Sequence, residues 1–332
     1  MNSKIASVAK YIFFLLLGGG LIWLAFRGIN TDELIATMQK ANLVWLIPAF
    51  IFSVIAHYSR GLRWNMLIES LGYSPTSINS FYAVCIGYLA NAAVPRLGEI
   101  TRCTILNRTD KVPMDSLIGT VVVERVIDVI TVLLVLSGLI LVRYDIFGAF
   151  FIGLLGEKFG FLISYWPYIL GVSMLGIALF FYFIKSWIER IKAIPGLGRI
   201  VQFIEGIFKG LQTIMKLKHP ILFTFYSGFI WLMYLFVTLS AFKCLAPTAD
   251  LGFTEGLAVI VAGGFGMAAP TPGGLGSYHI LVTEALVLFG ISRANGLAAA
   301  TLNHLTQTIF LLFLGGFSLL AIFLKGNNKK NT

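Results

Sequence analysis

Long apolar runs most strongly limit what this 332-residue chain can fold into. A helix needs ~20 largely apolar residues to cross a hydrocarbon core ~30 Å thick. Of the whole chain, 58% is hydrophobic and 12% is charged, far too few polar groups for a water-soluble surface. The apolar runs cover residues 11–26, 43–56, 126–142, 165–184, 221–242 and 296–324. They predict an all-α polytopic membrane protein with about six spanning helices.

The polar parts of the chain are short and basic. The longest polar stretch, residues 185–219, cannot bury a soluble core, so residues 1–332 are interpreted as a single integral membrane domain. The net charge of +10 is spread over the ends of the apolar runs. That distribution fits anionic lipid headgroups rather than a nucleic-acid partner.

The N-terminus invites comparison with a signal peptide. Lys4 and Lys10 precede an apolar run, but the run ends at residues 25–28 without a small-x-small cleavage site. We interpret it as an uncleaved first span. At the other end we expect a disordered basic tail over residues 325–332.

Two apolar stretches are interrupted by prolines and glycines. Residues 78–94 run into Pro95 and Gly98, and residues 254–269 run into a second break. The second break contains Pro270, Pro272, Gly273, Gly274 and Gly276. If each stretch were one ordinary span, the basic 185–219 segment would lie outside, against the positive-inside rule. If each is a re-entrant hairpin, 17 of the 25 Lys and Arg fall inside.

The hairpin interpretation fixes the side of each loop. It places both termini and residues 60–77, 102–116 and 185–219 in the cytoplasm, with residues 27–42, 143–164 and 243–253 outside. Two broken hairpins of opposite orientation are typical of inverted-repeat transporters. The alternative is that both breaks are simple loops at the membrane surface.

Charged residues recur inside the apolar helices. Glu124 and Asp128 share a helix face, and Arg125 is placed to pair with Asp128 at i,i+3. Such groups cost at least ~2.5–3.5 kcal/mol each near the bilayer centre, which makes them candidates for a functional site. An internal ion pair that only fixes helix packing is the alternative.

Together with Arg125, up to five arginines could converge on the inner half of the protein. Arg96 and Arg102 flank Glu99 after the first break, and Arg60 and Arg63 lie at the inner end of the second span. Arginine suits phosphate because its planar fork donates two hydrogen bonds at once. Snorkelling to the interface is the alternative for Arg60 and Arg63.

Histidines and cysteines give weaker signals. His279 and His304 fall within the membrane and could titrate near neutral pH, although a satisfied core histidine is the alternative for each. No histidine or cysteine spacing indicates a metal site or disulfide framework, and no nucleotide-binding or nucleophile motif is found. We therefore expect no metal, no cofactor and no catalytic residue.

Four motifs together resemble the transmembrane region of lysylphosphatidylglycerol synthase, also called the flippase-like domain family. The resemblance covers roughly residues 10–323. Its motifs are Arg60-x-x-Arg63-Trp64, Asn91 with Pro95-Arg96-x-Gly98-Glu99-x-x-Arg102, Glu124-Arg125-x-x-Asp128, and Pro272-Gly273-Gly274-x-Gly276. It implies a domain that moves a phospholipid between leaflets. In bifunctional members a separate soluble domain attaches an amino acid, and we expect no such activity here. Such proteins often carry glutamate where this chain has His279, so headgroup preference is expected to differ.

We therefore predict a lipid flippase-like transporter in a cell membrane, expected to be the bacterial cytoplasmic membrane. Its substrate would be a phospholipid or a lipid-linked precursor. The predicted headgroup-binding residues are Arg60, Arg63, Asn91, Arg96, Glu99, Arg102, Glu124, Arg125, Asp128 and His279. A membrane-embedded lipid-modifying transferase using its acids as general acid and base, and a non-transporting scaffold, are the alternatives. Whether the protein forms a homo-oligomer is left open.

Overall fold

The computed structural model describes residues 16–94, 96–146, 168, 175 and 216–328. Throughout these residues the secondary structure is helical, with no strand, as the apolar runs predict. The helices are α2 (Thr31–Gln39), α3 (Leu46–Glu69), α4 (Ser77–Ala93), α5 (Leu97–Asp110), α6 (Met114–Val142), α10 (Pro220–Phe242), α11 (Phe253–Ala268), α12 (Ser277–Leu288) and α13 (Arg293–Asn328). A short apolar helix, Leu16–Phe26, precedes them.

Four of the described helices, α3, α6, α10 and α13, are long and apolar enough to cross a membrane. They confirm four of the six predicted spans. The first predicted span is described only as Leu16–Phe26, and the predicted span 165–184 lies outside the described residues apart from two positions. Most of the basic segment 185–219 also lies outside them.

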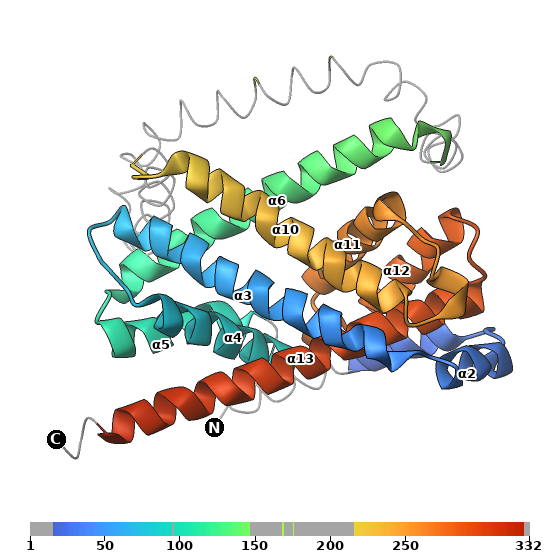
Figure 1. Ribbon diagram of the computed structural model, residues 1–332, viewed down its shortest axis with the longest axis horizontal. Helices are drawn as coiled ribbons and strands as arrows, with labels where there is room; N and C mark the ends of the chain where they lie inside the picture. Colours follow the sequence, from blue (N-terminus) through green and yellow to red (C-terminus); the bar gives the residue numbers. More distant parts are fainter. Residues whose placement is uncertain (1–15, 95, 147–167, 169–174, 176–215, 329–332) are drawn as a thin grey trace, which may run out of the picture.

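The two interrupted stretches fold as helical hairpins. α4 packs on α5, and α11 packs on α12. These four helices have 17, 14, 16 and 12 residues, so at ~1.5 Å per residue each is shorter than the ~30 Å hydrocarbon core. Figure 1 shows α4 and α5 at one end of the long helices and α11 and α12 at the other. The hairpins therefore insert from opposite ends, as the inverted arrangement predicts.

The break of the second hairpin packs against the first hairpin inside the protein. The turn at residues 272–274 packs on α4, and a Cβ added to Gly273 would lie 3.9 Å from the backbone of Ala92, the penultimate residue of α4. Gly273, Gly274 and Gly276 all have positive φ, which explains why glycine occupies these positions. His304 of α13 donates from Nε2 to the Gly273 carbonyl oxygen over 2.8 Å. Pro272 is buried in this turn and Pro270 is exposed just before it, whereas Pro95 is outside the described residues.

Among the described residues, loops predicted to share a side of the membrane share an end of the molecule. At one end Asp110 of α5 accepts hydrogen bonds from Thr76 N and Asn79 Nδ2, at 2.8 and 2.9 Å, and Lys325 of α13 donates to Asn79 Oδ1. Burial opposes ionisation of Asp110, but hydrogen bonds from Thr109, Thr76 and Asn79 outweigh it, so the pKa of its carboxyl lies below the ordinary value. Which end faces the cytoplasm stays a prediction.

The opposite end has its own polar contacts. Ser292 donates to Glu33 over 2.8 Å, and Arg143 lies 3.2 Å from Glu255 at the start of α11. Each half also has its own apolar core. One core gathers residues of α3, α4, α5 and α6 around Trp64, and the other gathers residues of α10 to α13 around Tyr278. α13 packs on α4 and on α12 and so joins the two halves.

Three predicted boundaries were wrong. α3 does not end near Arg60 but continues to Glu69, because the charges of Arg60 and Arg63 are paired inside the protein. The predicted loop 102–116 is largely helical, with only residues 111–113 between α5 and α6. The predicted disordered tail begins inside α13, which runs to Asn328.

Candidate functional site

Two arginines of α3 face two carboxylates of α6. Arg60 donates a hydrogen bond from Nη2 to Glu124 Oε1, and the same nitrogen lies 3.0 Å from Asp128 Oδ2. Arg63 Nη2 lies 2.7 Å from Asp128 Oδ1 and 3.7 Å from Glu124 Oε1. The spacing explains the geometry, since residues at i,i+3 and i,i+4 share one helix face. Snorkelling of these two arginines to the surface is thereby contradicted, because their side chains are 5% and 0% exposed.

α5 adds a third arginine to the same carboxylate. Arg102 Nη1 lies 3.2 and 3.1 Å from the two oxygens of Glu124. Its guanidinium lies 4.7 Å from the centre of the Trp64 ring, a cation–π contact. Trp64 in turn donates through its indole N–H to Thr120 on α6. Glu124 therefore ties α3 and α5 to α6.

α10 supplies partners that the sequence analysis missed. Arg60 Nη1 donates to the Tyr234 hydroxyl over 3.3 Å, and Arg63 Nη1 donates to Ser227 Oγ over 3.5 Å. Ser227 and Tyr234 are seven residues apart in an apolar helix, so both lie on one face. Two polar residues at that spacing are the signal that could have identified them.

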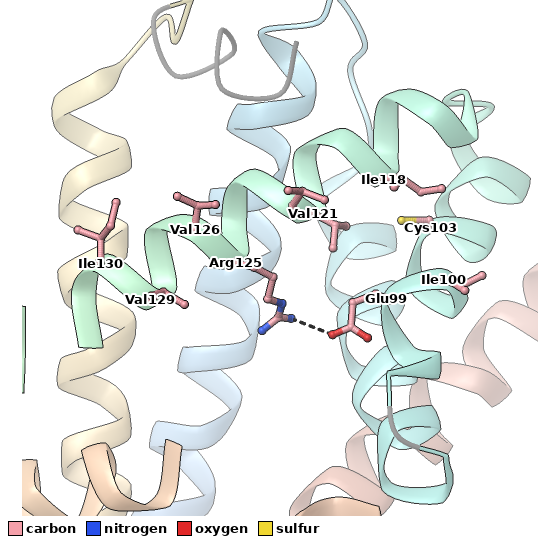
Figure 2. Close-up of a pocket in the computed structure, with 10 residues that line it drawn as sticks. Glu99, Ile100, Cys103, Ile118, Val121, Arg125, Val126, Val129 and Ile130 are labelled. Carbon is pink, nitrogen blue, oxygen red and sulfur yellow. Dashed lines mark ion pairs between the residues drawn. The ribbon is translucent and has the colours of Figure 1, made fainter. Parts of the chain in front are cut away.

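Arg125 and Glu99 form a looser pair at the edge of the cluster. Arg125 lies 3.7 Å from Glu99 and 3.7 Å from Asp128, outside hydrogen-bonding range in both cases. Their side chains are 42% and 30% exposed, in contrast to the buried Glu124. Figure 2 shows Arg125 of α6 and Glu99 of α5 pointing toward each other across the space between the two helices.

The cluster carries more positive than negative charge. Its members are Arg60, Arg63, Arg102, Arg125, Glu99, Glu124 and Asp128. Four arginines thus face three carboxylates, which leaves one positive charge in excess when all are ionised. Buried charge is costly unless it is paired, so this excess favours a bound anion.

Several polar atoms of the cluster lack a hydrogen-bond partner among the described residues. They include Arg102 Nη2, Arg125 Nε and Glu99 Oε2, all of them buried atoms. An unsatisfied buried donor or acceptor typically costs ~1–3 kcal/mol. Two of these atoms are N–H donors, on Arg102 and Arg125, and these two residues line one small cavity.

A close helix contact positions this side of the cluster. Asn91 Oδ1 of α4 accepts a hydrogen bond from the Gly98 N–H over 2.6 Å. A side chain at Gly98 would overlap the carbonyl oxygen of Gly87, so glycine lets α5 approach α4 closely. Asn91 and Gly98 therefore set the position of Glu99 and Arg102. They also line a cavity with room for little more than one water, bounded by Tyr88, Asn91, Glu99, Arg102 and Arg125 among others.

Three predicted site residues are not members of the cluster: Asn91, which contacts Gly98 beside it, Arg96 and His279. Arg96 is exposed at the break, with a left-handed φ of 65°, and forms no ion pair with any residue that the structure describes. His279 lies on α12, where its ring centre is 4.9 Å from that of His304. Its buried Nδ1 has no partner among the described residues. Their roles in headgroup binding stay predictions.

In the described part of the chain, no three His, Cys, Asp or Glu side chains are grouped in a way that could hold a metal ion. Cys85, Cys103 and Cys244 are free thiols buried in separate places.

The fold and the charged cluster define a polytopic α-helical membrane protein with a polar site enclosed by its helices. Residues 11–315 match the model of the protein family described as "Lysylphosphatidylglycerol synthase TM region", and the chain belongs to this family. This confirms the resemblance carried by the four motifs.

Two curated proteins are similar to the chain. One is a UPF0104 membrane protein of Methanocaldococcus jannaschii, 23% identical over 357 aligned residues, which cover 99% of this chain and 97% of that protein. The other is Glycosyltransferase AglD of Haloferax volcanii, 27% identical over 115 residues. That match covers 34% of this chain and 18% of the glycosyltransferase. No solved structure matches the chain significantly.

Proposed function

We propose that the protein is a flippase-like transporter that moves a phospholipid or lipid-linked precursor between the leaflets of the cell membrane. The observation that carries the proposal is the arginine-rich cluster enclosed by α3, α5, α6 and α10. It has one positive charge in excess, and Arg102 and Arg125 each hold an N–H that has no partner among the residues that the structure describes. A lipid phosphate supplies the missing negative charge and accepts both hydrogen bonds.

The two hairpins supply a route for conformational change. The turn of the second hairpin packs on α4 of the first, and the cluster lies beside the first break through Asn91, Gly98 and Glu99. Movement of one hairpin against the other would open the site toward one leaflet at a time, as in alternating access. The sequence contains no ATP-binding motif, so we expect transport to be downhill or coupled to an ion gradient.

Reconstitution in liposomes tests the proposal directly. A fluorescent phospholipid is incorporated, and the fraction accessible to a membrane-impermeant quencher is followed with time. We expect Arg125→Gln to slow lipid movement at least tenfold, because a charge-assisted hydrogen bond contributes ~1.5–3 kcal/mol. Leu134→Ala is the matched control, since Leu134 is an exposed apolar residue on the same helix.

The outcomes separate clearly. Folded wild-type protein that moves lipid no faster than protein-free liposomes would refute the proposal. Wild-type rates in both Arg125→Gln and Arg102→Gln would refute the assignment of the site. Arg96→Ala belongs in the same series, because Arg96 is exposed beside the break and its predicted role is independent of the cluster.

The similarity to a named glycosyltransferase favours a second candidate, a membrane-embedded transferase acting on a lipid. The similar region is 18% of that protein, so the match could equally be a shared membrane segment. Purified protein incubated in detergent with a labelled lipid and a nucleotide-sugar donor tests it. A new lipid product that is lost in Glu99→Gln would favour the transferase over the transporter.

A further inference from the structure

A broad apolar groove of about 670 Å³ lies between α5 and α6. Ten residues line it: Glu99, Ile100, Cys103, Ile118, Val121, Val122, Arg125, Val126, Val129 and Ile130. Eight of the ten are apolar, and rim residues such as Ile100 and Val129 are more than half exposed. Figure 2 shows the groove residues along α6 and α5, with the Glu99–Arg125 pair between the two helices.

Glu99 and Arg125 also line the small polar cavity behind the groove. Arg102, whose Nη2 has no described partner, lies on the cavity side of this pair. The pair therefore stands between an apolar surface that the described residues leave uncovered and the buried arginines. A ligand that passes from one to the other must meet these two side chains.

The ion pair between Glu99 and Arg125 is loose enough for either side chain to bind another partner. Arg125 Nη2 lies 3.7 Å from Glu99 Oε1, which is too far for a hydrogen bond. The other two polar atoms, Arg125 Nε and Glu99 Oε2, are buried without a partner among the described residues. A phosphate placed between them would give Arg125 the short, charge-assisted contact that Glu99 does not provide. The freed carboxylate could then accept a hydrogen bond from another part of the headgroup.

We propose that the α5–α6 groove is the site where a phospholipid enters sideways from the bilayer. One acyl chain lies along the groove, and the phosphate displaces Glu99 from Arg125 on its way to Arg102. The proposal rests on the proposed transport function. A volume of about 670 Å³ falls within the ~300–1,000 Å³ range of small-ligand sites.

The chemistry of the groove favours a lipid over another part of this chain. The predicted span 165–184 is the obvious internal competitor, but it contains no Asp or Glu. It could cover the apolar lining but could not offer Arg125 an anion. A phospholipid matches both parts of the site, since it joins a hydrocarbon chain to a phosphate.

Photolabelling in nanodiscs tests this inference without relying on transport. The probe is a phospholipid with a diazirine near the middle of one acyl chain, and labelled peptides are identified by mass spectrometry. We expect labelling concentrated on residues 100–103 and 118–130. Val126→Trp should fill the groove and reduce this labelling at least fivefold. Leu134→Trp is the matched control, because it adds the same bulk at an exposed site on α6 outside the groove.

The transport assay on the same variants distinguishes the two proposals. Slow transport in Val126→Trp with normal transport in Leu134→Trp supports the groove. Wild-type labelling and transport in Val126→Trp, together with slow transport in Arg125→Gln, would overturn the groove and leave the proposed function standing. Wild-type transport in both Val126→Trp and Arg125→Gln would overturn the groove and the role of Arg125, whereas wild-type protein that moves no lipid would overturn the proposed function. Disulfide formation between cysteines placed at Val126 and within residues 165–184 would identify the chain itself as the occupant and overturn the groove.

Discussion

Neutralising Glu124 tests the electrostatic reasoning most sharply. Its side chain is fully buried, and three arginines, Arg60, Arg63 and Arg102, lie within ion-pair distance of it. Glu124→Gln keeps the shape of the side chain but leaves four arginines facing two carboxylates. Removing one partner of a buried ion pair typically costs ~3–5 kcal/mol, because the remaining charge stays buried without compensation.

We therefore expect Glu124→Gln to lower the free energy of unfolding by about 3–5 kcal/mol. Arg102→Gln should also destabilise, since it removes two contacts to Glu124 and the cation over Trp64. The double variant Arg102→Gln/Glu124→Gln restores the net charge of the wild-type cluster, so its effect should fall short of the sum by about 0.5–3 kcal/mol. Leu134→Ala should change stability by less than about 0.5 kcal/mol, as is usual for an exposed position.

Titration with SDS in mixed micelles, followed by tryptophan fluorescence, measures these differences. A Glu124→Gln variant as stable as wild type, or strictly additive effects, would refute the reasoning. The transport assay adds a second readout. If the cluster only fixes helix packing, the double variant should regain transport along with stability; if Arg102 contacts the lipid phosphate, stability returns but transport does not.

Further variants test the backbone, the polar contacts and the topology. Gly98→Ala should destabilise by about 1–3 kcal/mol in the same titration because its Cβ overlaps Gly87, whereas Gly138→Ala, with nothing within 4 Å, should be neutral or stabilising; equal effects would refute the close approach of α4 and α5. Asp110→Asn should lower the thermal unfolding midpoint at pH 7, and the difference from wild type should shrink toward pH 3. Folding lowers the pKa of the Asp110 carboxyl, so its ionised form stabilises the folded protein at pH values above the pKa in the unfolded chain. This stabilisation is lost as the pH falls through the pKa in the folded protein, and a difference between variant and wild type that does not change with pH would contradict the prediction. Cysteines introduced at Glu205 and Asp250 should react with an impermeant maleimide from opposite faces of the membrane, and reaction of both from one face would refute the topology.

Much of the architecture follows from the sequence because lipid leaves few choices. Apolar length predicts the spans, and the distribution of Lys and Arg selects the hairpin arrangement over plain spans. The boundaries were harder. Arg60 and Arg63 suggested that a span ends, but they are accommodated inside α3 by carboxylates 61 to 68 positions later in the chain. Such long-range pairing is invisible in a local count of charges.

The site could be predicted in part for the same reason. Helical spacing placed Glu124 and Asp128 on one face, and the structure adds Arg60, Arg63 and Arg102 to that face from two other helices. Tyr234 and Ser227 were missed because single hydroxyls in an apolar helix commonly bond their own backbone. Arg96 is exposed because it lies at the break, before α5 begins and with a left-handed φ of 65°, whereas Arg102, six residues on, is buried within α5.

The arrangement of the cluster separates stability from binding. Arg60 and Arg63 are buried and held by Glu124 and Asp128 at 3.7 Å or less, so their charges are already compensated. The uncompensated positive charge therefore lies at Arg125, whose ion pairs are the longest in the cluster. That position is also the most exposed of the four arginines and the one nearest the apolar groove. Substitution of Arg60 should thus mainly lower the stability of the fold. Substitution of Arg125 should leave stability nearly unchanged and slow lipid transport. If Arg125 substitution mainly lowered stability and Arg60 substitution mainly slowed transport, the charge balance would not locate the headgroup.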